Sequence, residues 1–312
     1  MFFKKNTALN EEAKIAHQQA HFTNREEHSN FLLGALAWRG SVSPRILKTV
    51  LISTCYALIL AIIDIYYHEL PHLSVTPFEY TGAVLGLVLV FRTNAGYDRW
   101  WEARRLWGSI VNQSRNSFIM VANYGTNNPQ WQRAMNKWLI SFSFATKESL
   151  RGQKNFSDIA DILSEAEITQ LKNAAHAPLF VTNEIAALLN QAHQQYIMDK
   201  MLLIELEKHR GLLIDYLGSC ERILKTPMPL VYAIKIRRFI LTYLLLLPFS
   251  LIDEIGLMSA PVVGLVAYPL LSLDRIGLEL QNPFSKKSLS HLPLETICQT
   301  IKSNALAIVN SQ

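Results

Sequence analysis

Charged residues are scarce in this sequence. Asp, Glu, Lys and Arg make up 18% of its 312 residues, whereas 50% are hydrophobic and the mean hydropathy is +0.13. Soluble globular chains carry about 25% charged residues. The composition therefore excludes a disordered chain and leaves a membrane protein with a sizeable polar part, or an unusually apolar soluble one. After its two lysines the N-terminus has no apolar core, so we expect no signal peptide.

Motifs for catalysis and metal binding are also missing. The three cysteines, Cys55, Cys220 and Cys298, are widely spaced and form no CxxC pair, which argues against a disulfide framework or a zinc site. The sequence contains no HExxH, no GxSxG and no Gly-rich phosphate loop. The sequence also lacks a stripe of alternating basic and aromatic residues, which would indicate binding of nucleic acid. We therefore expect no enzymatic activity, no cofactor and no nucleic-acid partner.

Four stretches of the chain lack charge altogether: Thr49–Ile63, Tyr80–Phe91, Phe239–Ile252 and Ile255–Leu273. A helix needs about 20 residues to cross ~30 Å of hydrocarbon, so only the last, with 19 residues, does so unaided. Each of the others, taken alone, fits a buried core helix equally well. Lys and Arg gather before the first and third and after the second and fourth, while residues 64–79 contain neither. This positive-inside pattern predicts four membrane helices in two hairpins, with both termini cytoplasmic.

The residues between the two hairpins are predicted to form a cytosolic helical body. No stretch there alternates like a strand, Asn127-Asn128-Pro129 breaks one helical run, and Ser164–Ala174 and Thr182–Gly211 carry apolar residues at helical spacing. The expected fold is therefore an all-α membrane protein. Its expected parts are an N-terminal cytosolic segment (1–44), a first hairpin (45–101) whose second helix covers 78–101, a cytosolic helical region (102–232), a second hairpin (233–275) and a C-terminal cytosolic segment (276–312).

The second predicted membrane helix has an unusual stripe. Taken at every fourth position, the stripe is Glu79, Ala83, Leu87, Phe91 and Ala95. Residues at this spacing share one helix face, and the neighbouring Gly82 and Gly86 form a GxxxG pair that favours close helix packing. The apolar part of the stripe is either an ordinary packing face or, if several copies surround an axis, a set of stacked apolar rings that closes a pore by dewetting. Periodicity alone leaves both interpretations open.

The segment that follows, FRTNAGYDRWWEARRLWG at 91–108, resembles the corresponding segment of bacterial bestrophin homologues. Its tryptophans, Trp100, Trp101 and Trp107, suit a membrane–water boundary. The resemblance covers roughly 25–305 and continues through CERIL at 220–224, TPMP at 226–229, IRR at 236–238, DRIG at 274–277 and NPF at 282–284. It implies a homopentameric ion channel of the bacterial inner membrane, with four membrane helices per subunit around one central pore. Its partners would be further copies of itself, the lipid bilayer and the permeant monovalent ions.

Three further expectations come from this resemblance. The family's hydrophobic neck falls on Ala83, Leu87 and Phe91, and Ala83 is smaller than the usual occupant. The family's second, cytosolic constriction falls on Met201, for which ordinary core packing is the alternative. Animal members place a calcium-binding acidic cluster after NPF, where this chain has Lys286 and Lys287. Because calcium takes oxygen ligands, we expect no activation by calcium.

The permeant ion is not fixed by the sequence. Glu79 would place one carboxylate per subunit around the outer mouth, which favours cations such as sodium. Animal relatives conduct chloride, so an anion channel of the same architecture is the alternative. A non-conducting membrane scaffold is a second alternative.

Overall fold

A computed structural model describes residues 31–38, 40–67, 70–124, 128–195 and 198–310. The chain divides into two compact units, Met1–Pro44 and Arg45–Gln312. The described part of the first contains one short helix, α2 (Phe31–Ala35), and most of the expected N-terminal segment (1–44) lies outside the described residues. Everything below concerns the second unit.

The second unit is helical, and its described residues include no strand, which confirms the predicted all-α class. Two single-turn 3-10 helices, Ser157–Ile159 and Gly256–Met258, lie between the longer elements. The α-helices are α3 (Ser43–Tyr67), α4 (Thr76–Tyr124), α5 (Pro129–Leu150), α6 (Glu165–Asn173), α7 (Ala177–Gln194), α8 (Lys200–Lys225), α9 (Leu230–Ile255), α10 (Ser259–Glu279) and α11 (Leu294–Asn310).

Capping side chains explain where several helices begin. Asn128 accepts hydrogen bonds from the amides of Gln130 and Trp131 and is followed by a proline, so α5 begins where the sequence predicted a break. The helical stretch predicted at Thr182–Gly211 belongs to two helices, because α7 ends at Gln194 and α8 begins at Lys200. Asp199 accepts from the amide of Met201 at 2.9 Å and starts the new helix.

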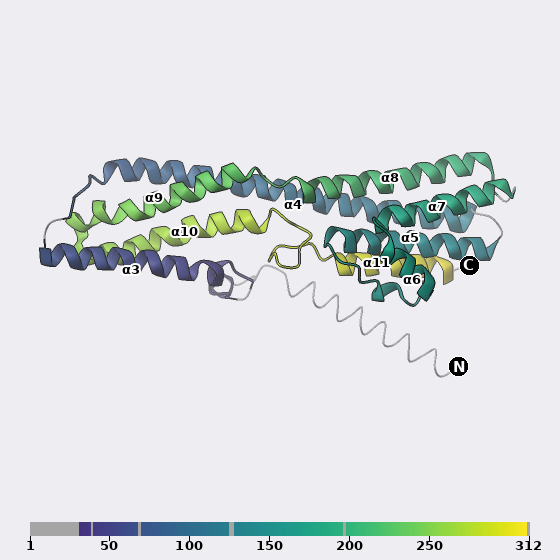
Figure 1. The fold of residues 1–312 in the computed structure, drawn as a ribbon, viewed down its shortest axis with the longest axis horizontal. Coiled ribbons are helices and arrows are strands. Elements are labelled where there is room, and N and C mark those ends of the chain that lie inside the picture. Colours follow the sequence, from purple (N-terminus) through teal and green to yellow (C-terminus); the bar gives the residue numbers. More distant parts are fainter. Residues whose placement is uncertain (1–30, 39, 68–69, 125–127, 196–197, 311–312) are drawn as a thin grey trace, which may run out of the picture. The chain divides into compact units, whose positions relative to one another are not determined.

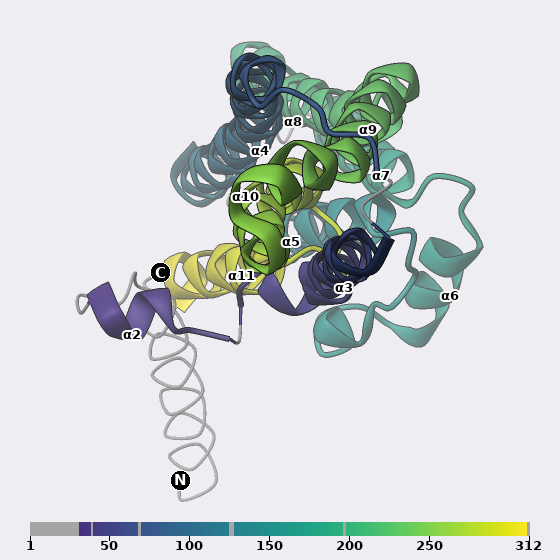
Figure 2. The same ribbon diagram turned by 90° about the vertical axis from the view of Figure 1, so that its left-hand side faces the viewer.

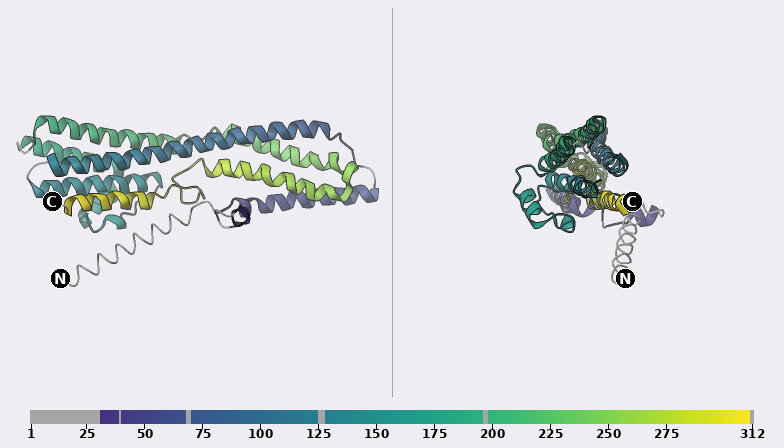
Figure 3. Two further views of the ribbon diagram at one scale, coloured as in Figure 1. Left: turned by 180° about the vertical axis from the view of Figure 1, so that it is seen from behind. Right: turned by 90° about the vertical axis from the view of Figure 1, so that its right-hand side faces the viewer.

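Helix α4 joins two separate cores. At 1.5 Å per residue its 49 residues span about 70 Å, so residues 101 and 102, the expected end of the first hairpin and start of the cytosolic region, both lie inside one continuous helix. Its first half packs against α9 and α10, and its second half packs against α5, α8 and α11 (Figures 1 and 3). The first core contains Leu85 and Leu89 of α4, and the second contains Trp107, Ile110 and Phe118.

Helices α9 and α10 contact each other and α4, and α3 touches both through side chains (Figure 2). The Tyr56 hydroxyl donates to the carbonyl oxygen of Leu245 in α9 at 3.2 Å, and Thr54 lies against Gly264 of α10, where a Cβ atom would meet its Oγ1 at 2.5 Å. α9 turns directly into α10 through Gly256, whose φ of 54° is accessible to glycine without strain.

Two stretches of the described chain are long and apolar enough to cross a membrane: α3, and one within Lys200–Glu279, which includes α9 and α10. The first half of α4 is not among them. The count of four membrane helices therefore stays a prediction.

Candidate pore-lining surface

The three predicted neck residues lie on an uncovered face of α4. Ala83 is exposed, and Leu87 and Phe91 are 56% and 59% exposed although both are large and apolar. Leu85 and Leu89, from the same turns, face the other way and are fully buried in the core with α9 and α10. Within a single chain, this part of α4 therefore has one packed face and one apolar face without a partner.

The uncovered face continues beyond Phe91 with a different chemistry. Steps of seven and four residues from Leu87 return to within about 20° of the same direction, at about 100° per residue. At those positions α4 exposes Asn94, Asp98, Arg105, Asn112 and Asn116. Strict steps of four along the predicted stripe lead instead to Ala95, which is half-buried. These polar residues were missed, although the average helical period of 3.6 would have found them.

Arg92 fixes which face of α4 is turned outward. It follows Phe91 directly but is fully buried, and its guanidinium pairs with the carboxylate of Asp274 in α10. Arg237 of α9 approaches the same carboxylate at 3.3 Å, and Gly277 leaves room for the Arg92 side chain. Because a buried charge without its partner is costly, rotating α4 away from this arrangement is unfavourable. The arginine thereby holds Phe91 on the uncovered side.

The rest of the recognised motif also holds α4 in place. Gly96 lies against α10, where a Cβ atom would meet the Gly277 carbonyl oxygen at 3.2 Å. Arg99 donates to carbonyl oxygens of Ile223 and Thr226 at the end of α8, which satisfies groups that a helix end leaves free. Trp107 is fully buried in the second core, so the expectation of a membrane-boundary residue there is wrong.

Met201 lies in the first turn of α8, and its side chain is 72% exposed. Ile204, three residues on, is 51% exposed. α8 runs along the second half of α4 (Figure 1), and Gln113 of α4 donates to the His209 carbonyl oxygen at 3.4 Å. Within this chain Met201 is thus not part of a core, and it lies at the end of α8 farther from α9.

Glu79 lies exposed in the first turn of α4, at the opposite end of the helix from the second core. A carboxylate in a first turn is also favourable for a reason unrelated to ions, because it complements the helix dipole. Glu79 lies eight residues before Leu87, about 80° from it around the helix at 100° per residue, so it is at the edge of the uncovered face and both roles stay open to it.

The loop after NPF supplies ammonium groups at the surface. Asn282 accepts hydrogen bonds from the amides of Phe284 and Ser285, which forms a turn, and Lys286 lies 2.7 Å from a carboxylate oxygen of Glu295. Burial alone would raise the pKa of Glu295, but hydrogen bonds from Arg151 and Lys286 hold this pKa well below its usual value. The Glu295 carboxylate is therefore already paired with two cations.

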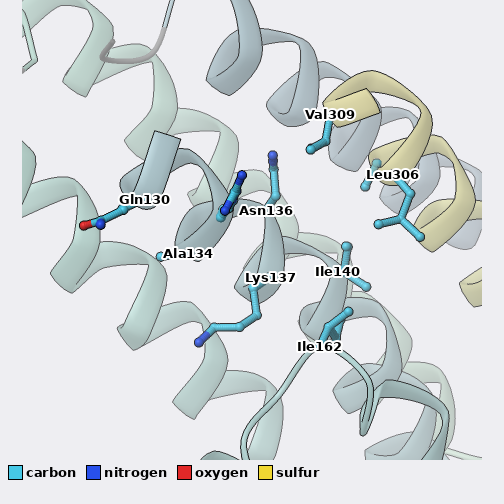
Figure 4. A pocket seen from close by; sticks show the side chains of 10 residues that line it. Gln130, Ala134, Asn136, Lys137, Ile140, Ile162, Leu306 and Val309 are labelled. Carbon is cyan, nitrogen blue, oxygen red and sulfur yellow. The ribbon is translucent and has the colours of Figure 1, made fainter. Parts of the chain in front are cut away.

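A pocket of about 450 Å³ lies away from the uncovered face, between α5 and α11 (Figure 4). Lys137, one of its lining residues, pairs with Glu167 of α6. None of the residues that line it belongs to α4, so it is not continuous with the uncovered stripe.

Comparisons with known proteins agree with the recognised motifs. A family model described as Bacterial/Fungal Bestrophin protein matches residues 22–307. A protein of Nostoc sp. is 38% identical over 280 residues (86% of this chain and 89% of that protein), and one of Synechocystis sp. is 36% identical over 276 residues (86% and 88%). Both are named voltage-dependent anion channel-forming proteins. A crystal structure of a bacterial bestrophin homologue from Klebsiella pneumoniae matches with a TM-score of 0.79 and 27% identity, covering 85% of this chain and 98% of that one.

Proposed function

The chain belongs to the bacterial and fungal bestrophin family, and from this premise we propose that it forms a homopentameric ion channel. The observation that carries the proposal is the uncovered face of α4. Large apolar side chains are left without a partner at Leu87 and Phe91, while the opposite face of the same turns is fully packed. If several copies were arranged around an axis, these faces would turn toward one another, and the apolar side chains that one chain leaves exposed would line a central pore.

The path of an ion follows the chemistry of this face. Ions enter past Glu79, cross the apolar neck of Ala83, Leu87 and Phe91, and then reach a polar stretch along the second half of α4. The neck closes the path by dewetting, because it offers no polar atom to replace the hydration shell. The exit lies at the far end of α8, where Met201 forms the narrow ring.

Monovalent cations such as sodium are the proposed permeant ions. Glu79 and Asp98 both lie exposed on the pore side of α4, and Asp98 has no ion-pair partner among the described residues. Rings of carboxylates concentrate cations in a pore. The alternative is an anion channel, which is favoured by the names of the Nostoc and Synechocystis relatives and by Arg105 on the same stripe.

We place the protein in the bacterial inner membrane with both termini cytoplasmic. The first hairpin (45–101) and the second (233–275) span the bilayer, and the residues between and after them form the cytosolic vestibule. Opening does not depend on calcium at the loop after NPF, because that loop presents Lys286 and Lys287 and the nearby Glu295 is already engaged.

Reversal potentials in planar bilayers under a NaCl gradient test this function. We expect the purified oligomer to reverse near the sodium potential, and both Glu79→Gln and Asp98→Asn to move the reversal toward zero. Arg105→Gln is the matched control and should leave cation preference intact or strengthen it. Reversal near the chloride potential, with Arg105→Gln as the variant that weakens it, would establish the anion alternative. No current from an intact oligomer would favour the scaffold.

A further inference from the structure

A groove of about 450 Å³ runs along one side of α3. It is lined by Lys48, Leu51, Ile52, Cys55, Tyr56 and Ile59. The lining residues recur at steps of three and four, so the groove follows the helix axis. Its walls are apolar apart from Lys48 and the Tyr56 hydroxyl, and that hydroxyl is already used, since it donates to the Leu245 carbonyl oxygen of α9. The charged group of the groove, the Lys48 ammonium, is therefore at one end.

The length of the groove matches one leaflet of a bilayer. From Lys48 to Ile59 is a rise of about 16 Å at 1.5 Å per residue. The hydrocarbon core of a bilayer is about 30 Å thick, so the groove covers roughly half of it. It begins at the end of α3 that we place at the cytoplasmic surface. This is the space that one acyl chain of an inner-leaflet phospholipid occupies.

The end of the groove at Lys48 has an excess of positive charge. Lys48 is exposed and has no ion-pair partner in the part of the chain that the structure describes. One turn earlier, Arg45 donates to the carbonyl oxygen of Lys287 at 3.1 Å, which brings the loop containing Lys287 beside this end of α3. The nearby carboxylate of Glu279 already binds both Arg45 and Arg275. It is therefore not available to neutralise Lys48.

We propose that this groove binds an anionic phospholipid of the cytoplasmic leaflet. One acyl chain lies along Leu51, Ile52 and Ile59, and the phosphate binds Lys48 with Lys287 nearby. A zwitterionic lipid fits the apolar walls equally well but gains little from the unpaired ammonium. Anionic headgroups are attracted to basic residues at the membrane surface. The site rests on the proposed topology, in which α3 spans the bilayer with Lys48 at the cytoplasmic surface, and it is independent of which ion the protein conducts.

The chain carries its own reporter position for this site. Cys55 is exposed inside the groove, whereas Cys220 and Cys298 are buried. Burial raises the pKa of both buried thiols to about 12, which makes them unreactive toward thiol reagents. A thiol-reactive fluorophore on the purified oligomer therefore labels the groove. The matched control is the same label on Leu58→Cys in a Cys55→Ser background, since Leu58 is exposed on α3 at nearly the same depth but does not line the groove.

The experiment compares quenching by brominated phosphatidylglycerol and brominated phosphatidylcholine, each at the same fraction in phosphatidylcholine vesicles. At Cys55 we expect phosphatidylglycerol to associate about fivefold more strongly than phosphatidylcholine. We expect a ratio near one at the Leu58 control position and after Lys48→Gln. A ratio near one at Cys55, or an equal preference at both positions, would overturn the proposal. Quenching at the control position but by neither lipid at Cys55 would also overturn it, because the groove would then be covered by protein.

Discussion

Two pairs of side chains on the same turns of α4 allow a packing role to be tested separately from a role in conduction. Leu85 and Leu89 point into the core with α9 and α10, while Leu87 and Phe91 point out of the chain. We compare Leu85→Ala plus Leu89→Ala with Leu87→Ala plus Phe91→Ala. Both double variants remove large apolar side chains at the same height, so they differ chiefly in the face that is changed.

The expected effects on stability follow from burial. Leu85 and Leu89 are both 0% exposed, and truncating a buried leucine to alanine costs about 2–5 kcal/mol. In lipid the cost of truncation comes mainly from lost packing contacts, because the outer solvent is itself apolar. We therefore take the lower end of this range for each leucine, which gives about 4 kcal/mol for the inner pair. Leu87 and Phe91 are already more than half exposed. Their truncation removes less contact within the chain and should cost about 1 kcal/mol each.

The assays are thermal unfolding of the purified oligomer and single-channel current in bilayers. We expect the outer pair to lose about half as much stability as the inner pair and to pass a current several-fold larger, since a wider apolar constriction dewets less readily. The inner pair should melt much earlier and, where it remains folded, should pass an unchanged current. If the outer pair lost as much stability as the inner pair and left the current unaltered, this face of α4 would be a packing surface and the neck would lie elsewhere.

Two further predictions concern how the helices are held. Gly277→Ala should destabilise the protein by about 2 kcal/mol, because the new Cβ atom would lie 3.3 Å from Arg92 Cγ. The control is Gly211→Ala, where a Cβ atom meets nothing within 4 Å, so this change should be neutral or stabilising. Thermal unfolding compares the two variants, and equal effects would contradict this account. The pKa of Glu295 is depressed, since hydrogen bonds such as that from Arg151 outweigh burial, so this group stabilises the fold above its ordinary value of 4.5 and loses that contribution as the pH falls below it. The difference in melting temperature between the unsubstituted protein and Glu295→Gln should accordingly shrink from pH 6 to pH 3, and a difference independent of pH would count against the interaction.

Local signals in the sequence were sufficient for much of the fold. The helical class follows from apolar periodicity, and the start of α5 follows from Asn128 and the proline after it, because a cap and a proline act on their immediate neighbours. The same kind of signal was overlooked at Asp199. There the apolar pattern continues across the break, so periodicity alone did not reveal that an N-cap begins a second helix.

The candidate site was predictable only in part, because the exposed face and the buried face of α4 carry the same types of residue. Leu85 and Leu87 are identical in chemistry, and which of them is buried depends on the partner helices and on the buried pair of Arg92 with Asp274. That pair joins residues far apart in the sequence, so no local pattern reveals it. The error at Trp107 has the same origin: a tryptophan suits a membrane boundary and a protein core equally well, and only the packing of α4 against its neighbours decides.

The unbroken length of α4 gives the molecule a mechanical property. A straight helix is stiff in torsion because every turn is tied to the next by backbone hydrogen bonds. A twist applied by α8 at Gln113, which donates to the His209 carbonyl oxygen, is therefore carried along the helix toward Phe91, about 33 Å away at 1.5 Å per residue. Because the buried pair of Arg92 with Asp274 ties α4 to α10, we expect a ligand or partner that binds α8 to strain this ion pair first and to turn Leu87 and Phe91 only when the pair gives way.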